Sequence, residues 1–290
     1  FGIGLQKKYS SGKPLIVDID DWELGFFYHS GFWGGVGRFL NFSNPNGLPY
    51  VWRIERLVGE ADAVSVSNRF LQKKFKGALL PHCRDTSVLD PQKFNPDEMK
   101  ERIGLADKKV VMFLGTPRPH KGLDDLLAAF KKIGDLNVKL VIIGAENQQE
   151  FLKRVDHSIR ESVVVLPKTP FQKLPELLSA ADILAIPQRR TSDSVGQIPA
   201  RLFDAMSMAK PIIATRVSDI PEVLDNCGYL VDPNKPSQLA DAIKYILNHS
   251  DEARVKGAAA RARCRQKYDI HNLESGLSGL IEQVIAKKAN

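Results

Sequence analysis

The sequence predicts an α/β protein built on a parallel, doubly wound sheet. Short, wholly apolar runs recur along the chain, and segments with apolar residues three or four positions apart follow most of them. Runs that are apolar throughout are typical of strands covered on both faces. Strands that alternate with helices favour a parallel sheet between two helical layers. Apolar residues make up 43% of the 290 residues, which is enough to fill such a core.

The first part of the chain predicts a few strands between irregular segments. The chain is expected to lead straight into a strand at 14–22, which runs into acidic residues. Residues 23–50 are rich in glycine and aromatic residues without a clean period, so loop or short helices are expected. Residues 54–77 predict a helix, a short strand and a second helix, and 77–85 a further short strand. The polar stretch 90–109 contains two prolines and is the best candidate for a linker between domains.

The remaining chain alternates regularly between strands and helices. The predicted strands are 110–115, 139–144, 162–167, 183–187, 211–217 and 228–233. The predicted helices are 123–135, 147–161, 175–182, 199–209, 219–226, 237–268 and 271–288. The last of these is amphipathic. No internal repeat interrupts this pattern.

Charge and cysteine content narrow the functional classes. The net charge of +7 and the pI near 9.2 fit a nucleic acid, an acidic membrane surface, an anionic small molecule or an ordinary basic surface. No zinc-finger or RNA-recognition signature supports the first of these. Three widely spaced cysteines without a C-x-x-C pair favour a reducing cytosol. No apolar run approaches the roughly 18 residues that span a bilayer.

The loop between strand 110–115 and helix 123–135 carries Arg118 and Lys121. In a doubly wound sheet, ligands bind where strands end and helices begin, and helix N-termini favour anions. The loop therefore predicts a phosphate site, with a solvated basic loop as the alternative. His120, between the two cations, is interpreted as a loop residue rather than a catalyst.

A second loop, after strand 183–187, has the same character. Ser194 to Ile198 are expected to present consecutive backbone N–H groups to an anion, and Pro199 suits the first turn of a helix. Arg201 and Asp204 are three residues apart and share a helix face. Asp204 is placed to accept hydrogen bonds from ribose, or else is an exposed acid that captures Arg201. Two such loops on one sheet predict a nucleotide diphosphate, although neither is a Walker loop or a G-x-G-x-x-G turn.

Several segments together resemble the donor-binding domain of retaining GT-B glycosyltransferases, the group 1 or GT4 type. They are GTPRPHKGLDDLLAAF, LVIIGAENQQEFL, LPELLSAADILAIP, RLFDAMSMAKPIIAT and VSDIPEVLDNCGYLVDP. Upstream, IERLVGEADAVSVSNRFLQ and LLPHCRD resemble the end of that family's N-terminal, acceptor-binding domain. The resemblance implies a truncated acceptor domain at 1–92 and a donor domain at 93–290, with helix 271–288 crossing back. Because the chain begins with Phe and lacks the start of the N-domain, further chain is expected before it, and activity of this fragment is left open.

The resemblance also implies site residues for the donor. The family's G-R-x-x-x-x-K-G motif is met by Gly115, Lys121 and Gly122, with Thr116 in the Arg place and Arg118 supplying the charge. In the family's Glu-x7-Glu motif, Asp204 holds the second, ribose-binding position. Gly196 holds the first, which normally touches sugar hydroxyls. Other members have Ser-x-Pro-x-Lys, with Arg201 in the Lys place here. The implied donor-binding residues are Gly115, Thr116, Gly196, Gln197, Ile198, Pro199, Arg201 and Asp204.

The implied reaction transfers a sugar from a nucleotide sugar with retention of anomeric configuration. Arg118, Lys121 and the helix dipole at Pro199 would stabilise the departing diphosphate, so no metal or other cofactor is required. Attack by the acceptor from the face that the diphosphate leaves needs no protein nucleophile. On the acceptor side, Asp20 or Asp21 would orient a hydroxyl, with a strand-end cap as an equal alternative. His29 is a weaker candidate.

The acceptor is left open between a glycan, a lipid-linked and a small molecule. Phe26, Phe27, Trp33 and Phe39 would contact a lipid-linked acceptor or a membrane, or belong to the exposed core of a truncated domain. The expected location is the cytoplasm, and a peripheral position at the inner face of the membrane is left open. Alternatives are a GT-B nucleotide-sugar epimerase and a non-catalytic nucleotide-sugar-binding module. A nucleic-acid-binding protein is the most distant alternative, and no nucleic-acid partner is expected.

Overall fold

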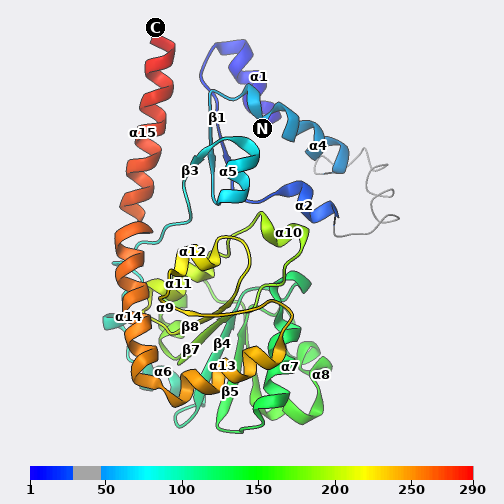
Figure 1. The fold of residues 1–290 in the computed structure, drawn as a ribbon, viewed down its shortest axis with the longest axis vertical. Coiled ribbons are helices and arrows are strands. Elements are labelled where there is room, and N and C mark those ends of the chain that lie inside the picture. Colours follow the sequence, from blue (N-terminus) through cyan, green and yellow to red (C-terminus); the bar gives the residue numbers. More distant parts are fainter. Residues whose placement is uncertain (29–46, 290) are drawn as a thin grey trace. The chain divides into compact units, whose positions relative to one another are not determined.

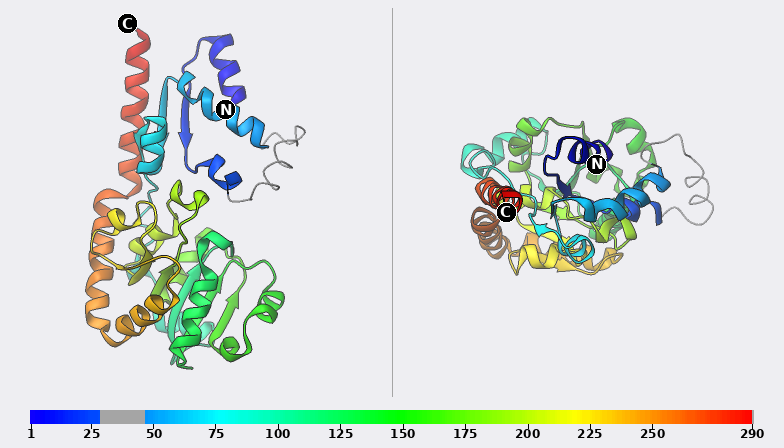
Figure 2. Two further views of the ribbon diagram at one scale, coloured as in Figure 1. Left: turned by 45° about the vertical axis from the view of Figure 1, so that its right-hand side comes forward. Right: turned by 90° about the horizontal axis from the view of Figure 1, so that it is seen from above.

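The structure, a computed structural model, describes residues 1–28 and 47–289. The chain divides into two compact units, which Figures 1 and 2 draw in three views. Unit 1 comprises Phe1–Cys83, Arg190–Ile198 and Ile270–Asn290, and unit 2 comprises Arg84–Arg189 and Pro199–Asp269. The domain boundaries expected from the sequence stay a prediction.

Unit 2 is built on a six-stranded parallel sheet in the order β6-β5-β4-β7-β8-β9. The strands are β4 (Lys109–Leu114), β5 (Val138–Ile143), β6 (Val163–Leu166), β7 (Ile183–Ile186), β8 (Ile212–Thr215) and β9 (Tyr229–Val231). At the centre, Val111 of β4 lies opposite Ile183 of β7. Each predicted strand of this part of the chain is present, and the prediction of a parallel α/β sheet is confirmed.

Helices cover both faces of this sheet because side chains of both faces are apolar. Helices α7 (Leu123–Ile133) and α13 (Pro236–Asn248) share one core cluster with alternate residues of the strands, including Phe113 and Ile142. Neighbouring strand residues such as Met112 point to the opposite face and are just as fully buried. Figure 1 shows α13 lying across the strands.

The other helices of unit 2 follow the alternation, with one departure from expectation. They are η2 (Pro91–Lys93), α6 (Pro96–Arg102), η3 (Pro119–Lys121), α8 (Gln148–Arg154), η4 (His157–Ser162), η5 (Phe171–Lys173), α9 (Leu174–Ser179), α11 (Arg201–Ser207), α12 (Ile220–Leu224) and α14 (Ser250–Lys267). The segment 90–109 is not a linker. Asn95 caps α6 and Pro96 occupies its first position, so the proline starts a helix here. Met99 is buried, and Lys100 Nζ lies 2.7 Å from Asp182 Oδ2.

Unit 1 holds a three-stranded parallel sheet in the order β1-β2-β3. The strands are β1 (Ile16–Ile19), β2 (Ala63–Val66) and β3 (Ala78–Leu79). The helices are α1 (Gly2–Ser11), α2 (Glu23–Tyr28), α4 (Leu48–Leu57), η1 (Val58–Glu60), α5 (Arg69–Phe75), α10 (Ser192–Val195) and α15 (Ile270–Ala289). The chain does not lead straight into a strand, because α1 comes first and ends at Gly12, whose φ of 62° stops it. No helix of the described residues has both the length and the apolar character needed to cross a membrane.

Candidate functional site

The order of the strands in unit 2 marks a place for a ligand. From β4 the chain proceeds to β5 and β6 on one side, and from β7 to β8 and β9 on the other. The carboxyl ends of β4 and β7 are therefore the switch point of the sheet, where doubly wound folds bind ligands. The loop that contains Arg118 and Lys121 leaves β4 at this point, and the loop that begins at Pro187 leaves β7.

These two loops are in direct contact. A β-carbon at Gly122 would lie only 1.7 Å from the carbonyl oxygen of Pro187, and the φ of Gly122 is 70°. Glycine is therefore required at position 122 for the close approach. The N–H of Arg189 donates to the carbonyl of His120 over 2.8 Å. His120 itself is buried in the loop.

A two-pronged ion pair fixes the same junction. The guanidinium of Arg189 donates two hydrogen bonds of 2.8 Å to the two carboxylate oxygens of Asp125 in the first turn of α7. The hydrogen bond to Asp125 raises the pKa of Arg189. Bidentate pairs of this kind hold a fixed geometry. The start of α7 is thus tied to the loop after β7.

Two cationic side chains converge on Gly115, the first residue after β4. A β-carbon at Gly115 would lie 3.2 Å from Lys121 Nζ and 3.5 Å from NH1 of Arg201. Gly115 has a φ of 114°, which favours glycine. The absence of a side chain lets an ammonium and a guanidinium both approach the backbone at this point. This cradle, formed by Gly115, Lys121 and Arg201, is suited to an anion.

Arg201 is held in the cradle by its neighbours on β4. Its NH1 donates to the carbonyl of Leu114 over 2.8 Å, and its guanidinium lies 4.8 Å from the centre of the Phe113 ring. Its Nε and NH2 have no partner within the part of the chain that the structure describes. The side chain is 93% buried, and burial lowers the pKa of Arg201 to about 10, so it stays charged at neutral pH. Buried charge without a partner is unfavourable, which makes Arg201 a ready donor to an anionic ligand.

Asp204 does not capture Arg201, so the alternative of an exposed acid is wrong. Asp204 is buried and forms an ion pair with the Nε of Arg84. NH2 of Arg84 also donates to the carbonyl of Ala200 over 3.2 Å. Sequence reasoning missed Arg84, since nothing in the pattern links it to a residue so far along the chain.

The side chains of Arg118 and Thr116 lie apart from these contacts. Arg118 is exposed, and its side chain makes no hydrogen bond or ion pair with the described residues. Thr116 lines a separate pocket of about 350 Å³. The other residues of that pocket are Pro117, Ala145, Glu146, Asn147, Glu150, Phe151 and Arg154. In this structure it is therefore Arg201, and not Arg118, that joins Lys121 at Gly115.

The loop at 190–198, which belongs to unit 1, does not offer a free row of N–H groups. The N–H groups of Ser194 and Val195 donate to the carbonyl of Thr191, and that of Gln197 donates to the carbonyl of Ser194. Thr191 and Ser194 form a capping box at the N-terminus of α10. The expectation of consecutive free donors is wrong at these positions, because the segment folds into a helical turn.

Gly196 and Gln197 contact the end of β1 within unit 1. A β-carbon at Gly196 would lie 2.4 Å from Cβ of Trp22, so no carboxylate fits at this position. The N–H of Trp22 donates to the carbonyl of Gly196 over 3.2 Å. Gln197 Nε2 donates to Asp21 Oδ1 over 2.9 Å. Asp21 therefore places a carboxylate beside Gln197, next to the position of Gly196 where none fits.

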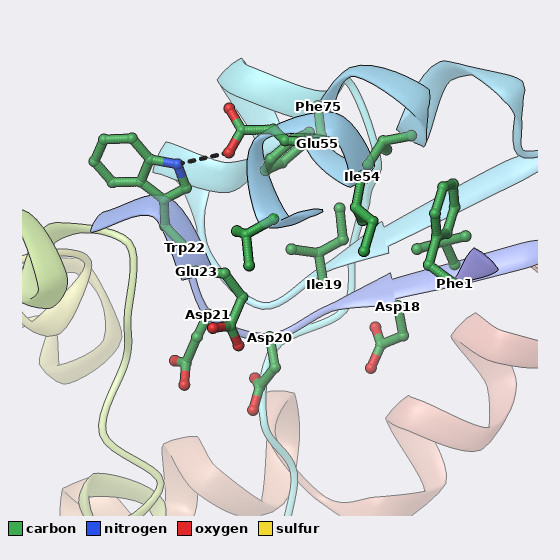
Figure 3. Close-up of a pocket in the computed structure, with 13 residues that line it drawn as sticks. Phe1, Asp18, Ile19, Asp20, Asp21, Trp22, Glu23, Ile54, Glu55 and Phe75 are labelled. Carbon is green, nitrogen blue, oxygen red and sulfur yellow. Dashed lines mark hydrogen bonds between the residues drawn. The ribbon is translucent and has the colours of Figure 1, made fainter. Parts of the chain in front are cut away.

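A pocket of about 630 Å³ lies in unit 1 beside the end of β1. Figure 3 shows the carboxylates of Asp20, Asp21 and Glu23 gathered on one side of it. The lining residues are Phe1, Val17, Asp18, Ile19, Asp20, Asp21, Trp22, Glu23, Val51, Ile54, Glu55, Val58 and Phe75, and none is basic. Burial, and then the charge of Asp21, raise the pKa of Glu23.

Neighbouring residues hold the walls of this pocket. Asp20 Oδ1 lies 3.3 Å from His82 Nε2, and Trp22 Nε1 donates to Glu55 Oε2 over 3.1 Å. Asp20 and Asp21 therefore line a cavity large enough for a sugar. The expected candidates His29, Trp33 and Phe39 lie outside the described residues. Within residues 1–28 and 47–289, no three His, Cys, Asp or Glu side chains are grouped as metal ligands.

Comparison with known proteins identifies the part of the chain that contains the cradle. Residues 108–249 match the family described as Glycosyl transferases group 1. This segment belongs to the glycosyl transferases group 1 family. It spans β4 to the end of α13, and so includes Gly115, Lys121, Arg201 and Asp204.

Curated relatives of the group 1 segment carry glycosyltransferase names. The chain is 29% identical over 224 residues to the GDP-mannose-dependent alpha-(1-6)-phosphatidylinositol monomannoside mannosyltransferase of Mycolicibacterium smegmatis, covering 72% of this chain and 59% of that protein. It is 24% identical over 265 residues to the D-inositol 3-phosphate glycosyltransferase of Acidothermus cellulolyticus, covering 80% of this chain and 57% of that protein. The chain thus spans less than two thirds of the length of either relative.

Solved structures extend the likeness beyond the group 1 segment. Anabaena HepE in complex with UDP and glucose matches with a TM-score of 0.77 at 16% identity, over 97% of this chain and 75% of that chain. Sucrose-phosphate synthase from Thermosynechococcus elongatus matches with a TM-score of 0.72 at 19% identity, over 98% and 76%. At these identities the likeness concerns the fold, and the prediction of a GT-B fold is confirmed.

Proposed function

We propose that this chain binds a nucleoside-diphosphate sugar and transfers the sugar, with retention, to an acceptor hydroxyl. The observation that supports this most strongly is the convergence of Lys121 and Arg201 on Gly115 at the switch point of the sheet. The group 1 relatives named above are glycosyltransferases, one of them GDP-mannose-dependent. UDP is present in the HepE structure.

The cradle would act on the departing diphosphate. Negative charge grows on the phosphate oxygens as the bond to the sugar breaks, and cations already in place stabilise it without reorganisation. Lys121 and the unpartnered N–H groups of Arg201 would meet that charge, and Arg118 would add to it from the exposed end of the loop. Because these side chains supply the positive charge, we propose that no metal ion is needed.

The acceptor would bind in the acidic pocket of unit 1. Carboxylates beside aromatic side chains suit sugar hydroxyls, which donate hydrogen bonds to the acids. A phosphate group would be repelled by the same acids, since no basic residue lines the pocket. We therefore expect a neutral or amine-bearing acceptor at this pocket, oriented by Asp20 or Asp21. A peripheral contact with the inner face of the membrane stays a prediction.

One observation favours a second candidate function. Gly196 stands where the family has a carboxylate, and Trp22 leaves no room for one. A nucleotide-sugar-binding module without turnover would have no need of that acid. Measuring both donor binding and sugar transfer separates the two functions. A binding module would bind the nucleotide sugar without releasing the nucleotide, whereas a transferase would release it.

The direct test is a calorimetric titration with UDP, GDP and ADP, without added metal. Micromolar binding of one nucleotide identifies the base, and Lys121→Ala is expected to weaken it by about tenfold or more, since hydrogen bonds to charged groups contribute roughly 1.5–3 kcal/mol. Lys267→Ala is the matched control, because Lys267 is an exposed lysine at the end of α14. Unchanged affinity in Lys121→Ala would refute the role of the cradle.

A further inference from the structure

A second cavity of about 310 Å³ lies at the other edge of the unit 2 sheet. It is bordered by the residues at the amino ends of β4, β7 and β8, by α6, and by the turn from α13 to α14. Its lining residues are Pro96, Asp97, Lys100, Lys109, Ser179, Ala181, Asp182, Ala209, Lys210, Pro211, Ile246, Leu247, Ser250, Ala253 and Arg254. Since β4 separates the two edges, about 17 Å of strand lies between this cavity and the cradle at Gly115.

Basic side chains from four separate segments surround this cavity. They are Lys100 on α6, Lys109 at the start of β4, Lys210 before β8, and Arg254 on α14. Two acids oppose them, Asp97 and Asp182. Positive charge therefore exceeds negative charge around the cavity.

The acid deepest in the cavity is already engaged. Asp182 Oδ2 accepts a hydrogen bond of 2.7 Å from Lys100 Nζ and another of 2.7 Å from the N–H of Val110. Lys100 in turn also donates to the carbonyl of Lys108. Asp97 is exposed. Arg254 pairs with the exposed Asp251 over 3.3 Å, outside the lining of the cavity. The carboxylates of the lining thus leave Lys109 and Lys210 without an ion-pair partner among the described residues.

Lys210 is the most enclosed of the cavity's unpaired basic side chains. Its ammonium donates to the carbonyl of Ser179 over 2.6 Å. Burial lowers the pKa of Lys210 to about 8, although the negative charge of Asp182 opposes this shift more than the positive charge of Lys100 adds to it. A cation in this position is stabilised by any anion that enters the cavity.

The start of α14 adds to the positive electrostatic potential in the cavity. Ser250, the first residue of this 18-residue helix, lines the cavity, and the preceding His249 makes no side-chain capping bond. The positive end of the helix dipole therefore adds to the four basic side chains.

We propose that this cavity binds a small phosphate anion, either inorganic phosphate or a phosphate ester, with Lys210 as its central contact. The site is separate from the proposed donor cradle, because the two lie at opposite ends of β4. Inorganic phosphate and small phosphate esters fit the volume, whereas a nucleoside-diphosphate sugar is the ligand proposed for the other edge.

The test follows the Cε–Hε resonance of Lys210 by NMR, assigned through its loss in Lys210→Met. Titration near pH 8 with inorganic phosphate, and separately with glycerol 3-phosphate, is expected to raise the pKa of Lys210 from about 8 toward its ordinary value. The ion that acts at the lower concentration is the better ligand. Lys109→Ala and Arg254→Ala, both changes of exposed residues, are each expected to weaken the response by about fivefold.

Two controls can overturn the proposal. Sodium chloride at equal ionic strength should leave Lys210 unchanged, and an equal response would reveal simple screening. Lys121→Ala should leave the response intact, whereas its loss there would place the phosphate in the donor cradle. A Lys210 resonance that responds to neither phosphate compound would also refute the site.

Discussion

The guanidinium of Arg84, which is half-buried, forms an ion pair with the buried carboxylate of Asp204 inside unit 2. Arg84 precedes the group 1 segment, and Asp204 lies within it, on α11. Asp204 is the acid expected to bind ribose. Its carboxylate is therefore already oriented by a cation before any nucleotide arrives, and the change of either residue affects both stability and binding.

Asp204→Ala is expected to have two effects. It leaves the half-buried Arg84 without its acid, which should lower the free energy of unfolding by about 1–3 kcal/mol. It should also reduce affinity for a ribonucleoside diphosphate more than affinity for pyrophosphate, which lacks ribose. Urea unfolding and calorimetry measure the two effects. Arg84→Met and the double variant Arg84→Met/Asp204→Ala complete a thermodynamic cycle for the stability of the ion pair. Equal losses of affinity for the nucleoside diphosphate and for pyrophosphate would exclude contact between Asp204 and ribose.

Gly115→Ala tests whether nucleotide binding requires the absence of a side chain at position 115. The new methyl group would lie 3.2 Å from Lys121 Nζ and 3.5 Å from NH1 of Arg201, in the space proposed for phosphate. We expect nucleotide affinity to fall by about tenfold or more, together with a stability loss of about 1–3 kcal/mol from the strained φ.

Gly134→Ala is the matched control for this change. Gly134 also has a positive φ, of 65°, but a β-carbon there meets nothing within 4 Å. It should therefore lower stability by about 1–2 kcal/mol and leave nucleotide binding unchanged. Equal loss of binding in both variants would mean that backbone strain, and not the occupied cradle, causes it.

Arg201→Met is expected to separate stability from binding. The change removes a buried charge whose Nε and NH2 lack partners among the described residues, so we expect the unliganded protein to be as stable as the natural chain or more stable. The affinity for a nucleoside diphosphate should fall by about tenfold to a hundredfold. Thermal unfolding measures the stability of the unliganded protein, and its shift with added nucleotide measures the affinity. A large loss of stability without nucleotide would instead assign Arg201 a structural role through Leu114.

Lys210 should make stability depend on pH in the alkaline range. Its pKa is about 8 in the folded protein and 10.5 as the ordinary value, so the unfolded chain binds more protons between these limits. Stability should therefore rise with pH from about 8 to 10.5, by on the order of 2–3 kcal/mol. Lys210→Met should be more stable than the natural chain near pH 7, and this advantage should vanish near pH 10.5. Urea unfolding in phosphate-free buffer measures it, and a constant difference across the range would contradict the assignment.

The sheet of unit 2 could be predicted because buried parallel strands have a strong sequence signature. Each strand is a short apolar run, and the helix that follows it has apolar residues three or four positions apart. The position of Gly115 and Lys121 at the carboxyl edge follows from that alternation alone. Local sequence also accounts for Gly122, since a sharp turn between strand and helix favours glycine.

The contacts between distant segments could not be predicted in this way. Arg84 meets Asp204, and Trp22 fills the space beside Gly196, through tertiary packing that leaves no local pattern. The error at 90–109 has a different origin. The polar composition and two prolines of this stretch favour a linker, yet Pro96 after the capping Asn95 begins a helix. The helix α1 was missed because its polar sequence has little amphipathic period.

The chain passes between the two units at 83/84, 189/190, 198/199 and 269/270. Cutting the polypeptide once therefore yields no fragment that equals either unit. An engineer who wishes to graft a different nucleotide preference onto this protein would have to exchange 84–189 and 199–269 together. The nine residues 190–198 of this protein would have to be kept unchanged, so that Gln197 still donates to Asp21.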